Sequence, residues 1–265
     1  GCWGRVFFKY LAIIKLIIIS FVYFTEVYAD EPEKIVGGTD ASVGEFPYQV
    51  SLRHYDIHVC GGSIVSERHI ITAAHCVGDV GEGFYNFYVV SGTVKLDDPD
   101  GQIHRVESIR IHPGYMGGRE FSWANDAALI TLKEPIQFNA NQKPIPLATS
   151  DPPENAPLIL SGWGQLGARL DGPNHLQKAT VYYIGNEQCQ KAFPRTSIFE
   201  THLCALHSTG IVLFFCLQGD SGGPLVYNGH LVGIVSWVLP CARGKPDVYT
   251  RVALYDNFFS EALQA

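Results

Sequence analysis

A serine set among glycines is the feature of this sequence best suited to chemistry. Residues 219–224 read Gly-Asp-Ser-Gly-Gly-Pro, a setting in which backbone N–H groups can face the same space as the Ser221 hydroxyl. Acyl transfer needs such an arrangement, because a hydroxyl attacks a carbonyl carbon while amide hydrogens stabilise the charge that develops on the carbonyl oxygen. Taken alone, the segment could equally be a glycine-rich turn. As a site, it predicts Ser221 as nucleophile and the N–H groups of Gly219 and Ser221 as the oxyanion donors.

A base for this serine, and a group to orient the base, are also present. His75 lies in the segment Thr-Ala-Ala-His-Cys after an apolar pair, and Asp126 precedes the apolar run of residues 127–130. A buried aspartate beside a histidine fixes the imidazole tautomer and stabilises the imidazolium that forms when the serine loses its proton. The chain order His75, Asp126, Ser221 is one of the known orders of this triad. We therefore expect these three residues to be catalytic.

A fourth motif completes a resemblance to a known family. Residues 34–38 read Lys-Ile-Val-Gly-Gly, which is similar to the activation site of the trypsin/chymotrypsin-family serine endopeptidases. With the three triad motifs in the same order, the chain resembles this family from Ile35 to about its C-terminus. Residues 240–252, Pro-Cys-Ala-Arg-Gly-Lys-Pro-Asp-Val-Tyr-Thr-Arg-Val, look most like the insect chymotrypsin-like branch. The resemblance implies an all-β fold of two packed six-stranded antiparallel β-barrels, with the active site in the cleft between them.

The resemblance also implies activation by proteolysis. Cleavage after Lys34 by a trypsin-like protease would free the α-amino group of Ile35. In this family that group folds inward and pairs with the aspartate before the nucleophile, here Asp220. A buried carboxylate without a partner is unfavourable, and breaking a buried ion pair costs roughly 3–5 kcal/mol. Asp220 therefore has little reason to turn inward before cleavage, and we expect the oxyanion loop to become ordered only afterwards.

The pocket beside the nucleophile, which sets specificity in this family, departs from the usual pattern. Two residues instead of one separate Cys216 from the Gly-Asp-Ser segment. Counting from Cys216 places Phe214 at the pocket base, whereas counting back from Ser221 places Phe215 there. Neither residue is acidic, so the aspartate found at the bottom of an ordinary trypsin pocket is missing. The extra residue could also tilt the Gly219 N–H, and losing one oxyanion donor typically costs about 2.7–4 kcal/mol.

The remaining pocket positions allow two specificities. Val238 should narrow the pocket, and Ser236, Trp237 and Val238 resemble the segment to which substrate binds as an added β-strand. Asp247 can reach the pocket base, where it would either bind a basic side chain or lie neutralised beneath an apolar one. We expect cleavage after apolar or aromatic residues; the alternative is trypsin-like cleavage after Lys or Arg through Asp247.

Three functions are compatible with these motifs. The first is a secreted serine endopeptidase that is made as a zymogen and works through an acyl-enzyme. The second is a catalytically inactive homologue that binds or regulates other proteins, which only the apolar insertion around Phe214 and Phe215 favours. The third is a hydrolase of small esters, against which the peptide-binding segment argues. An error in the sequence between Thr209 and Gly219 would also explain the insertion.

Charge and the N-terminal pattern limit the partners and the location. The formal net charge is −7, which argues against nucleic acid or an anionic membrane as a partner. Residues 1–29 read as a secretory signal peptide and not as a membrane anchor, because their apolar run contains Lys15 and is shorter than the about 20 residues of a spanning helix. Residues 30–34 would be the propeptide, and residues 35–265 the peptidase domain. We expect a secreted, extracellular monomer whose partners are peptide or protein substrates, an activating protease and protein protease inhibitors.

The chain has seven cysteines, of which Cys2 lies in the expected signal peptide. An even number in the rest of a secreted chain predicts disulfides, and sequence alone leaves their pairing open. The resemblance implies the pairs Cys60–Cys76, Cys189–Cys204 and Cys216–Cys241. A zinc site is the rival interpretation, but the cysteines are scattered and no Cys-x-x-Cys motif occurs. The family's calcium loop is acidic, whereas residues 81–91 offer only Glu82, so we expect no metal and no cofactor.

Short apolar segments between Gly and Pro residues predict strands in both halves of the chain. These segments are Tyr48–Leu52, Ser63–Val65, Tyr85–Val90, Ala127–Leu132, Leu158–Gly162, Ala179–Ile184 and Pro224–Trp237. Residues 144–157 contain five prolines and read as the connection between the two halves. Residues 252–263 have helical apolar spacing and predict a C-terminal helix. Every histidine other than His75 is expected to be a surface or satisfied structural residue.

Overall fold

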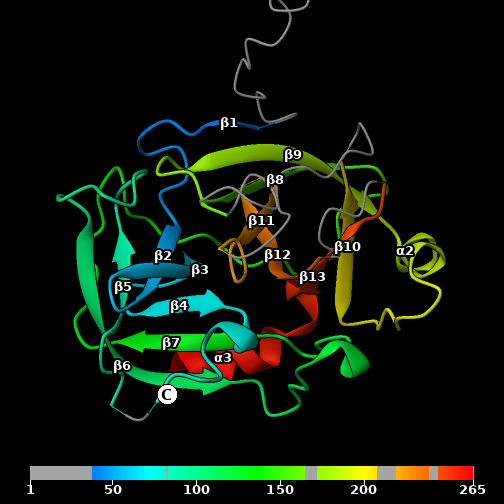
Figure 1. The fold of residues 1–265 in the computed structure, drawn as a ribbon, viewed down its shortest axis with the longest axis horizontal. Helices are drawn as coiled ribbons and strands as arrows, with labels where there is room; N and C mark the ends of the chain where they lie inside the picture. The colour runs from blue at the N-terminus through cyan, green and yellow to red at the C-terminus, as the bar shows by residue number, and fades with distance from the viewer. Residues whose placement is uncertain (1–37, 82, 165–171, 208–218, 239–243, 265) are drawn as a thin grey trace, which may run out of the picture. The chain divides into compact units, whose positions relative to one another are not determined.

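The computed structural model describes residues 38–81, 83–164, 172–207, 219–238 and 244–264. The chain divides into two units between Lys34 and Ile35, and all described residues belong to the second unit. Antiparallel strands dominate that unit and form two closed barrels (Figure 1). The expected fold of two six-stranded barrels is confirmed.

The first barrel closes in the order β2-β3-β4-β7-β6-β5. Its strands are β2 (Gln49–His54), β3 (Ile57–Ile64), β4 (His69–Thr72), β5 (Phe87–Ser91), β6 (Gln102–Ile111) and β7 (Ala128–Leu132). Aliphatic side chains fill its interior, among them Val50, Leu52, Ile64, Ile70 and Ile130. β6 was not expected from the sequence, because most of its side chains face outward and only His104 and Val106 are buried.

The second barrel closes in the order β8-β9-β10-β13-β12-β11, and β11 pairs back with β8. Its strands are β8 (Pro157–Gly162), β9 (Gln177–Ile184), β10 (His202–Leu206), β11 (Pro224–Tyr227), β12 (His230–Trp237) and β13 (Asp247–Arg251). The short strand β1 (Gly38–Asp40) adds to β9 outside the barrel. Asn228 and Gly229 join β11 to β12 with φ of 47° and 76°, the left-handed conformations that a tight hairpin turn requires. The expected segment 224–237 is therefore two strands.

A hydrophobic cluster contains residues from strands of both barrels and from the C-terminal helix α3 (Asp256–Gln264). Ile71 and Leu129 come from the first barrel, Ile234 comes from the second, and Phe259 comes from α3. The predicted C-terminal helix is present, but it begins later than expected. Residues 252–254 form the 3-10 turn η3, and α3 begins at Asp256, an acidic residue of the kind that a helix N-terminus favours. This cluster joins the two halves that carry the candidate site.

The connection between the barrels contains no strand from residue 133 to residue 156. It is held to both halves by backbone hydrogen bonds. The Ile145 N–H donates to Ile64 of β3 at 2.9 Å, and the Ala148 N–H donates to Leu231 of β12 at 3.0 Å. The proline-rich segment therefore connects the two barrels and is hydrogen-bonded to each of them.

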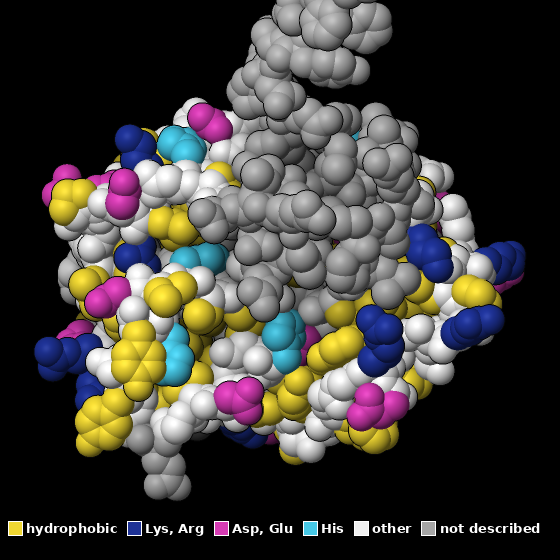
Figure 2. Space-filling model, viewed as in Figure 1, with side chains coloured by type: hydrophobic (Ala, Val, Ile, Leu, Met, Phe, Trp, Pro, Cys, Tyr) yellow, Lys and Arg dark blue, Asp and Glu magenta, His cyan; other side chains and the backbone are white. Residues whose placement is uncertain are grey.

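Both acidic and basic side chains are present on the face of the molecule that Figure 2 shows. None of the helices in the described ranges is both long and apolar enough to cross a membrane. The other α-helix in the part of the chain that the structure describes is α2 (Asn186–Ala192), which is joined to β10 by a disulfide described below.

Candidate active site

The predicted nucleophile and base line one cleft of about 620 Å³. His75 lies on the 3-10 turn η1 (Ala74–Cys76), which begins two residues after the end of β4, whereas Ser221 lies three residues before the start of β11. Each barrel therefore contributes one of the two groups. Gly219 lines the same cleft. Residues of both barrels line this cleft, which is where the sequence analysis expects the site.

Asp126 is bound to His75 in the manner that the sequence predicted. Its Oδ2 lies 2.7 Å from His75 Nδ1, and its Oδ1 accepts the His75 backbone N–H at 3.0 Å. Strand pairing explains the contact, because Thr72 at the end of β4 is opposite Ala128 at the start of β7. His75 follows Thr72 and Asp126 precedes Ala128, so both residues lie at the same end of the barrel.

The second barrel completes the surroundings of Asp126, which is 1% exposed. Ser236 Oγ donates to Asp126 Oδ2 at 2.6 Å, and Thr250 Oγ1 donates to the Asp126 carbonyl oxygen at 2.7 Å. Ser236 lies where the pairing of β12 with β13 shifts by one residue. Such bulges re-aim side chains near active sites. Ser236, expected only in substrate binding, thus also holds the carboxylate.

The environment of His75 prepares it to accept a proton. Burial of the ring disfavours the imidazolium, but the charge of Asp126 and its hydrogen bond outweigh this effect and raise the pKa of His75 above 6.5. Because Nδ1–H donates to Asp126, Nε2 of the neutral ring is the free acceptor. A base whose pKa lies nearer to the working pH transfers protons more efficiently.

The turn that follows Ser221 requires glycine at position 222. Gly222 has φ of 78°, and a Cβ there would lie 2.1 Å from Thr72 Oγ1. The Gly222 N–H donates to Val235 at 2.8 Å, and the Ser221 carbonyl accepts from Gly61 at 2.8 Å. Within the described ranges, the N–H groups of Gly219 and Ser221 donate to no backbone oxygen. With respect to the described residues, both groups are therefore available for the expected oxyanion role.

His58 supports this loop, a role that the sequence did not predict. Its Nε2 lies 2.8 Å from the Gly219 carbonyl oxygen, and its Nδ1 lies 2.8 Å from Ser51 Oγ. Burial lowers the pKa of His58 to about 4, so the ring is neutral at neutral pH. Since a carbonyl only accepts, Nε2 must carry the proton and donate to Gly219. His58 therefore fixes the peptide that follows Gly219.

Asp220 lies inside the protein and is 5% exposed. Its Oδ1 accepts the Gly164 N–H at 2.8 Å, while Oδ2 has no hydrogen-bond partner among the described residues. A Cβ at Gly162 or Gly164 would come within 1.8 Å or 1.7 Å of the carboxylate oxygens. The two glycines thus make room for Asp220. The carboxylate is already turned inward in the uncut chain, which differs from the expectation that it turns only after cleavage.

Two buried acids lie close enough to affect each other. Burial raises the pKa of Asp220 to about 8, the Gly164 hydrogen bond opposes the rise, and the charge of Asp247 adds to it. Burial raises the pKa of Asp247, at the start of β13, to about 7. Burial therefore shifts both carboxyl groups toward the protonated form.

The expected pocket residues are described only in part. Trp237 is buried at the end of β12, and Val238 is half-buried. Trp237 pairs with Val248 of β13, the residue after Asp247. The expectations for Phe214 and Phe215 at the pocket base fall outside the described residues, as do those for Lys34 and Ile35.

Two predicted disulfides are present. Cys60 of β3 is bonded to Cys76 beside the base, and Cys189 of α2 is bonded to Cys204 of β10. The pair Cys216–Cys241 lies outside the described residues. The ligand atoms of Cys60, His75 and Cys76 lie within 4.8 Å of one another, but both sulfurs belong to the disulfide. They therefore offer no thiolate to a metal ion.

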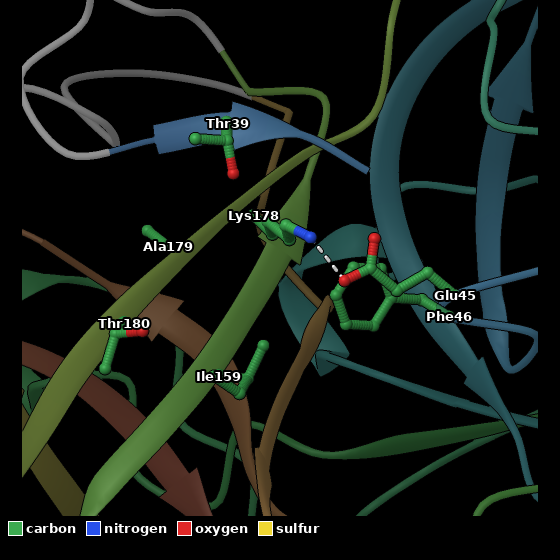
Figure 3. Close-up of a pocket in the computed structure, with 7 residues that line it drawn as sticks. All are labelled: Thr39, Glu45, Phe46, Ile159, Lys178, Ala179 and Thr180. Carbon is green, nitrogen blue, oxygen red and sulfur yellow. Dashed lines mark hydrogen bonds and ion pairs between the residues drawn. The ribbon is translucent and has the colours of Figure 1, made fainter. Parts of the chain in front are cut away.

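A second cavity, of about 260 Å³, lies beside β1 and β9. It is lined by Thr39, Glu45, Phe46, Ile159, Lys178, Ala179 and Thr180 (Figure 3). Lys178 forms an ion pair with Glu45 among these residues. The lining contains no nucleophile paired with a base, so this cavity does not compete with the cleft as a catalytic site.

Comparisons with known proteins agree with this geometry. The family model described as Trypsin matches residues 35–259. Chymotrypsin-2 of Vespa crabro is 37% identical over 82% of this chain and 94% of its own length. Trypsin of Phaedon cochleariae is 32% identical over 96% of this chain and 98% of its own length.

A solved structure is similar as well. It is described as neuropsin, a serine protease expressed in the limbic system of mouse brain. It superposes with a TM-score of 0.77 at 32% identity, over 85% of this chain and 98% of its own.

Proposed function

Because the chain belongs to the trypsin family of serine proteases, we propose that it is a secreted endopeptidase that is made as a zymogen and uses Ser221, His75 and Asp126 as its catalytic triad. One observation carries this proposal. The base, bound to a buried aspartate at 2.7 Å, lines the same cleft as the serine. Two disulfides support secretion, since disulfides persist in oxidising compartments.

The proposed reaction uses groups of three residues that line the cleft, namely His75, Gly219 and Ser221. Ser221 Oγ attacks the scissile carbonyl carbon, and its proton passes to Nε2 of His75. The charge on the carbonyl oxygen is stabilised by the N–H groups of Gly219 and Ser221. His75 then protonates the leaving amine as the C–N bond breaks. Water, deprotonated by the same histidine, releases the acyl group by the reverse steps.

Activation is proposed to pair the new Ile35 ammonium with Asp220. The carboxylate is buried, with Oδ2 unpartnered among the described residues, so a cation there would be strongly favoured. Until then Asp220 has a raised pKa, and the folded chain holds a proton that the unfolded chain releases. The intact chain therefore loses stability as pH rises from 3.8 to about 8.

Replacing Lys34 with glutamine is expected to leave an inactive precursor after treatment with a trypsin-like protease. Cleaved wild-type protein should gain activity and should also lose the fall in thermal stability between pH 4 and about 8 that Asp220 causes. Activity assays and melting temperatures across this pH range measure both effects. The Lys34→Arg variant is the matched control and should behave like the wild type. Activation of Lys34→Gln without a new Ile35 terminus would contradict the proposed switch.

Specificity is proposed to favour apolar or aromatic residues before the scissile bond. Asp247 is 6% exposed, and its pKa of about 7 leaves much of it protonated near neutrality. A neutral acid beneath the pocket tolerates an apolar side chain, whereas an ionised one would attract Lys or Arg. The relatives include both chymotrypsins and trypsins by name, so Asp247 is the residue to test.

Cleavage of a mixed peptide library by protein processed to begin at Ile35 tests this proposal. We expect cuts mainly after Phe, Tyr and Leu, and the same preference in an Asp247→Asn variant, because the acid serves there in its neutral form. The exposed Asp100→Asn is the matched control. Cuts after Lys and Arg that strengthen above pH 7 and vanish in Asp247→Asn would instead show trypsin-like specificity.

The inactive homologue remains the second candidate, and the extra residue between Cys216 and the Gly-Asp-Ser segment is the observation that favours it. A folded, processed protein that cuts no peptide in the library would support this candidate. In either case the proposed partners are peptides or proteins, which bind along the segment that ends at Val238.

A further inference from the structure

The residue before Asp126 has an unusual backbone. Asn125 has φ of 56°, in the left-handed region where asparagine is enriched over most other residues. Its carbonyl oxygen accepts the Ala127 N–H at 2.9 Å, which closes a three-residue turn with Asp126 at its centre. The conformation of residue 125 therefore sets the direction in which the chain enters this turn, and with it the direction of the Asp126 side chain.

The side-chain amide of Asn125 is hydrogen-bonded at both ends. Its Nδ2 donates to the Gly114 carbonyl oxygen at 2.8 Å, and its Oδ1 accepts from the Tyr255 hydroxyl at 3.1 Å. Since a carbonyl oxygen only accepts, the NH₂ group must face Gly114, and Oδ1 is then the atom that faces Tyr255. Gly114 follows β6, whereas Tyr255 lies between η3 and α3. Two segments far apart in the sequence therefore hold the same amide.

Tyr255 has a fixed place in the core. It is 3% exposed and belongs to the hydrophobic cluster that contains residues of both barrels and α3. The His112 ring meets it edge-on, with centroids 5.2 Å apart. Burial raises the pKa of Tyr255, so its hydroxyl keeps its proton and remains a donor. A buried tyrosine hydroxyl usually finds a hydrogen-bond partner, and Asn125 provides one here.

We propose that Asn125 and Tyr255 are positioning residues for the triad. Tyr255 and Gly114 clamp the Asn125 amide. The clamped residue then closes the turn that aims the Asp126 carboxylate at His75 Nδ1. The C-terminal segment thereby contributes to the geometry of the base. This inference deepens the proposed function and rests on it, because the clamp affects catalysis only if Asp126 orients His75.

Two substitutions separate this role from a mere tolerance of the left-handed backbone. Glycine adopts positive φ readily but has no amide, so Asn125→Gly removes the clamp without straining the turn. Tyr255→Phe removes only the hydroxyl and keeps the ring beside His112. Because a misplacement of about 1 Å can cost about 10²-fold in rate, we expect Asn125→Gly to lower kcat about tenfold and Tyr255→Phe about threefold. The KM of both processed variants should stay within about twofold of wild type, since neither residue is proposed to touch substrate.

The two effects should not add, because the hydroxyl acts through Asn125. The double variant should therefore have the kcat of Asn125→Gly alone. Tyr183→Phe is the matched control, since Tyr183 is 7% exposed but lies in a different hydrophobic cluster of the second barrel. It should leave kcat unchanged. A wild-type kcat in Asn125→Gly would overturn the inference, because asparagine would then serve only the backbone conformation.

Proton NMR provides a readout that needs no catalysis. The hydrogen bond from His75 Nδ1–H to Asp126 is present in the uncut chain and should give a resonance far downfield. In Asn125→Gly and Tyr255→Phe this resonance should move upfield, and the pKa of His75 should fall, because Asp126 is what raises it.

An unchanged resonance and an unchanged His75 pKa in both variants would overturn the inference, whether or not the processed wild type cuts peptides. If the resonance moves in the variants but the processed wild type hydrolyses no peptide, the result would count against the proposed function alone. Tyr183→Phe should retain the wild-type spectrum in this region.

Discussion

Replacing Ser221 with alanine is expected to lower kcat by about 10⁶, because removal of the nucleophile leaves only binding and oxyanion stabilisation. The fold should remain intact. The contacts of Ser221 with the described residues run through its backbone, with the carbonyl accepting from Gly61 at 2.8 Å. Truncation of the hydroxyl leaves that bond and the Gly222 turn unchanged. Peptide hydrolysis and the melting temperature of the processed protein measure the two expectations.

Trapping the acyl-enzyme sharpens this test. An activated ester should give a burst of product equal to the enzyme concentration, and the acyl group should be found on the peptide that contains Ser221. Ser108→Ala, at an exposed position of β6, is the matched control and should retain the burst. Activity of Ser221→Ala within tenfold of the wild type would show that another residue is the nucleophile. A wild-type protein without a burst would favour the inactive homologue.

The proposed catalytic residues could be identified because each lies in a short motif, but their contacts depend on strand pairing. His75 and Asp126 are 51 residues apart and meet because β4 is paired with β7. Nothing in either segment specifies its partner strand. The apolar segments identified strands in both barrels, but β4, β6, β10 and β13 had no predicted segment. β6 was missed because most of its side chains face outward.

The supporting residues could not be predicted for a related reason. His58 lies beside a register shift between β2 and β3, so alternation along the strand does not indicate which face it occupies. Ser236 likewise lies at a shift between β12 and β13. Gly162 and Gly164 are recognisable as functional only once Asp220 is seen to fill the space that a Cβ would occupy. The role of each of these residues depends on a contact with a distant part of the chain, which its own local sequence does not indicate.

Replacing Asp126 with asparagine is expected to lower kcat by about 10⁴ at neutral pH with little change in KM, a loss of the size that this substitution causes in triads of this kind. The structure gives the reason. The carboxylate receives three donors, namely the His75 backbone N–H, His75 Nδ1–H and the Ser236 hydroxyl. Asparagine must place its NH₂ group against at least one of them, so the hydrogen bonds cannot all remain.

Only one orientation of the asparagine can be accommodated. An NH₂ group in place of Oδ1 would face the His75 backbone N–H, which cannot turn away. In place of Oδ2 it would face the Ser236 hydroxyl, which can rotate, and the His75 ring, which can change tautomer. The ring would then carry its proton on Nε2 and could not accept the proton of Ser221. The loss therefore comes from a wrong tautomer in an intact site, which a crystal structure of the variant would show as unchanged side-chain positions.

The pH dependence distinguishes this explanation from a simple loss of charge. The Asp126 charge and hydrogen bond raise the pKa of His75 against the effect of burial, and only the neutral ring acts as a base. In the wild type, activity should rise with pH through this raised pKa. In Asp126→Asn the burial effect remains without its compensation, so the residual activity should begin to rise at a lower pH. Ser236→Ala, which keeps the carboxylate, should leave the acidic limb near its wild-type position. If the acidic limb moved to higher pH in Asp126→Asn, this would contradict the assignment of Asp126 as the residue that orients His75 and raises its pKa.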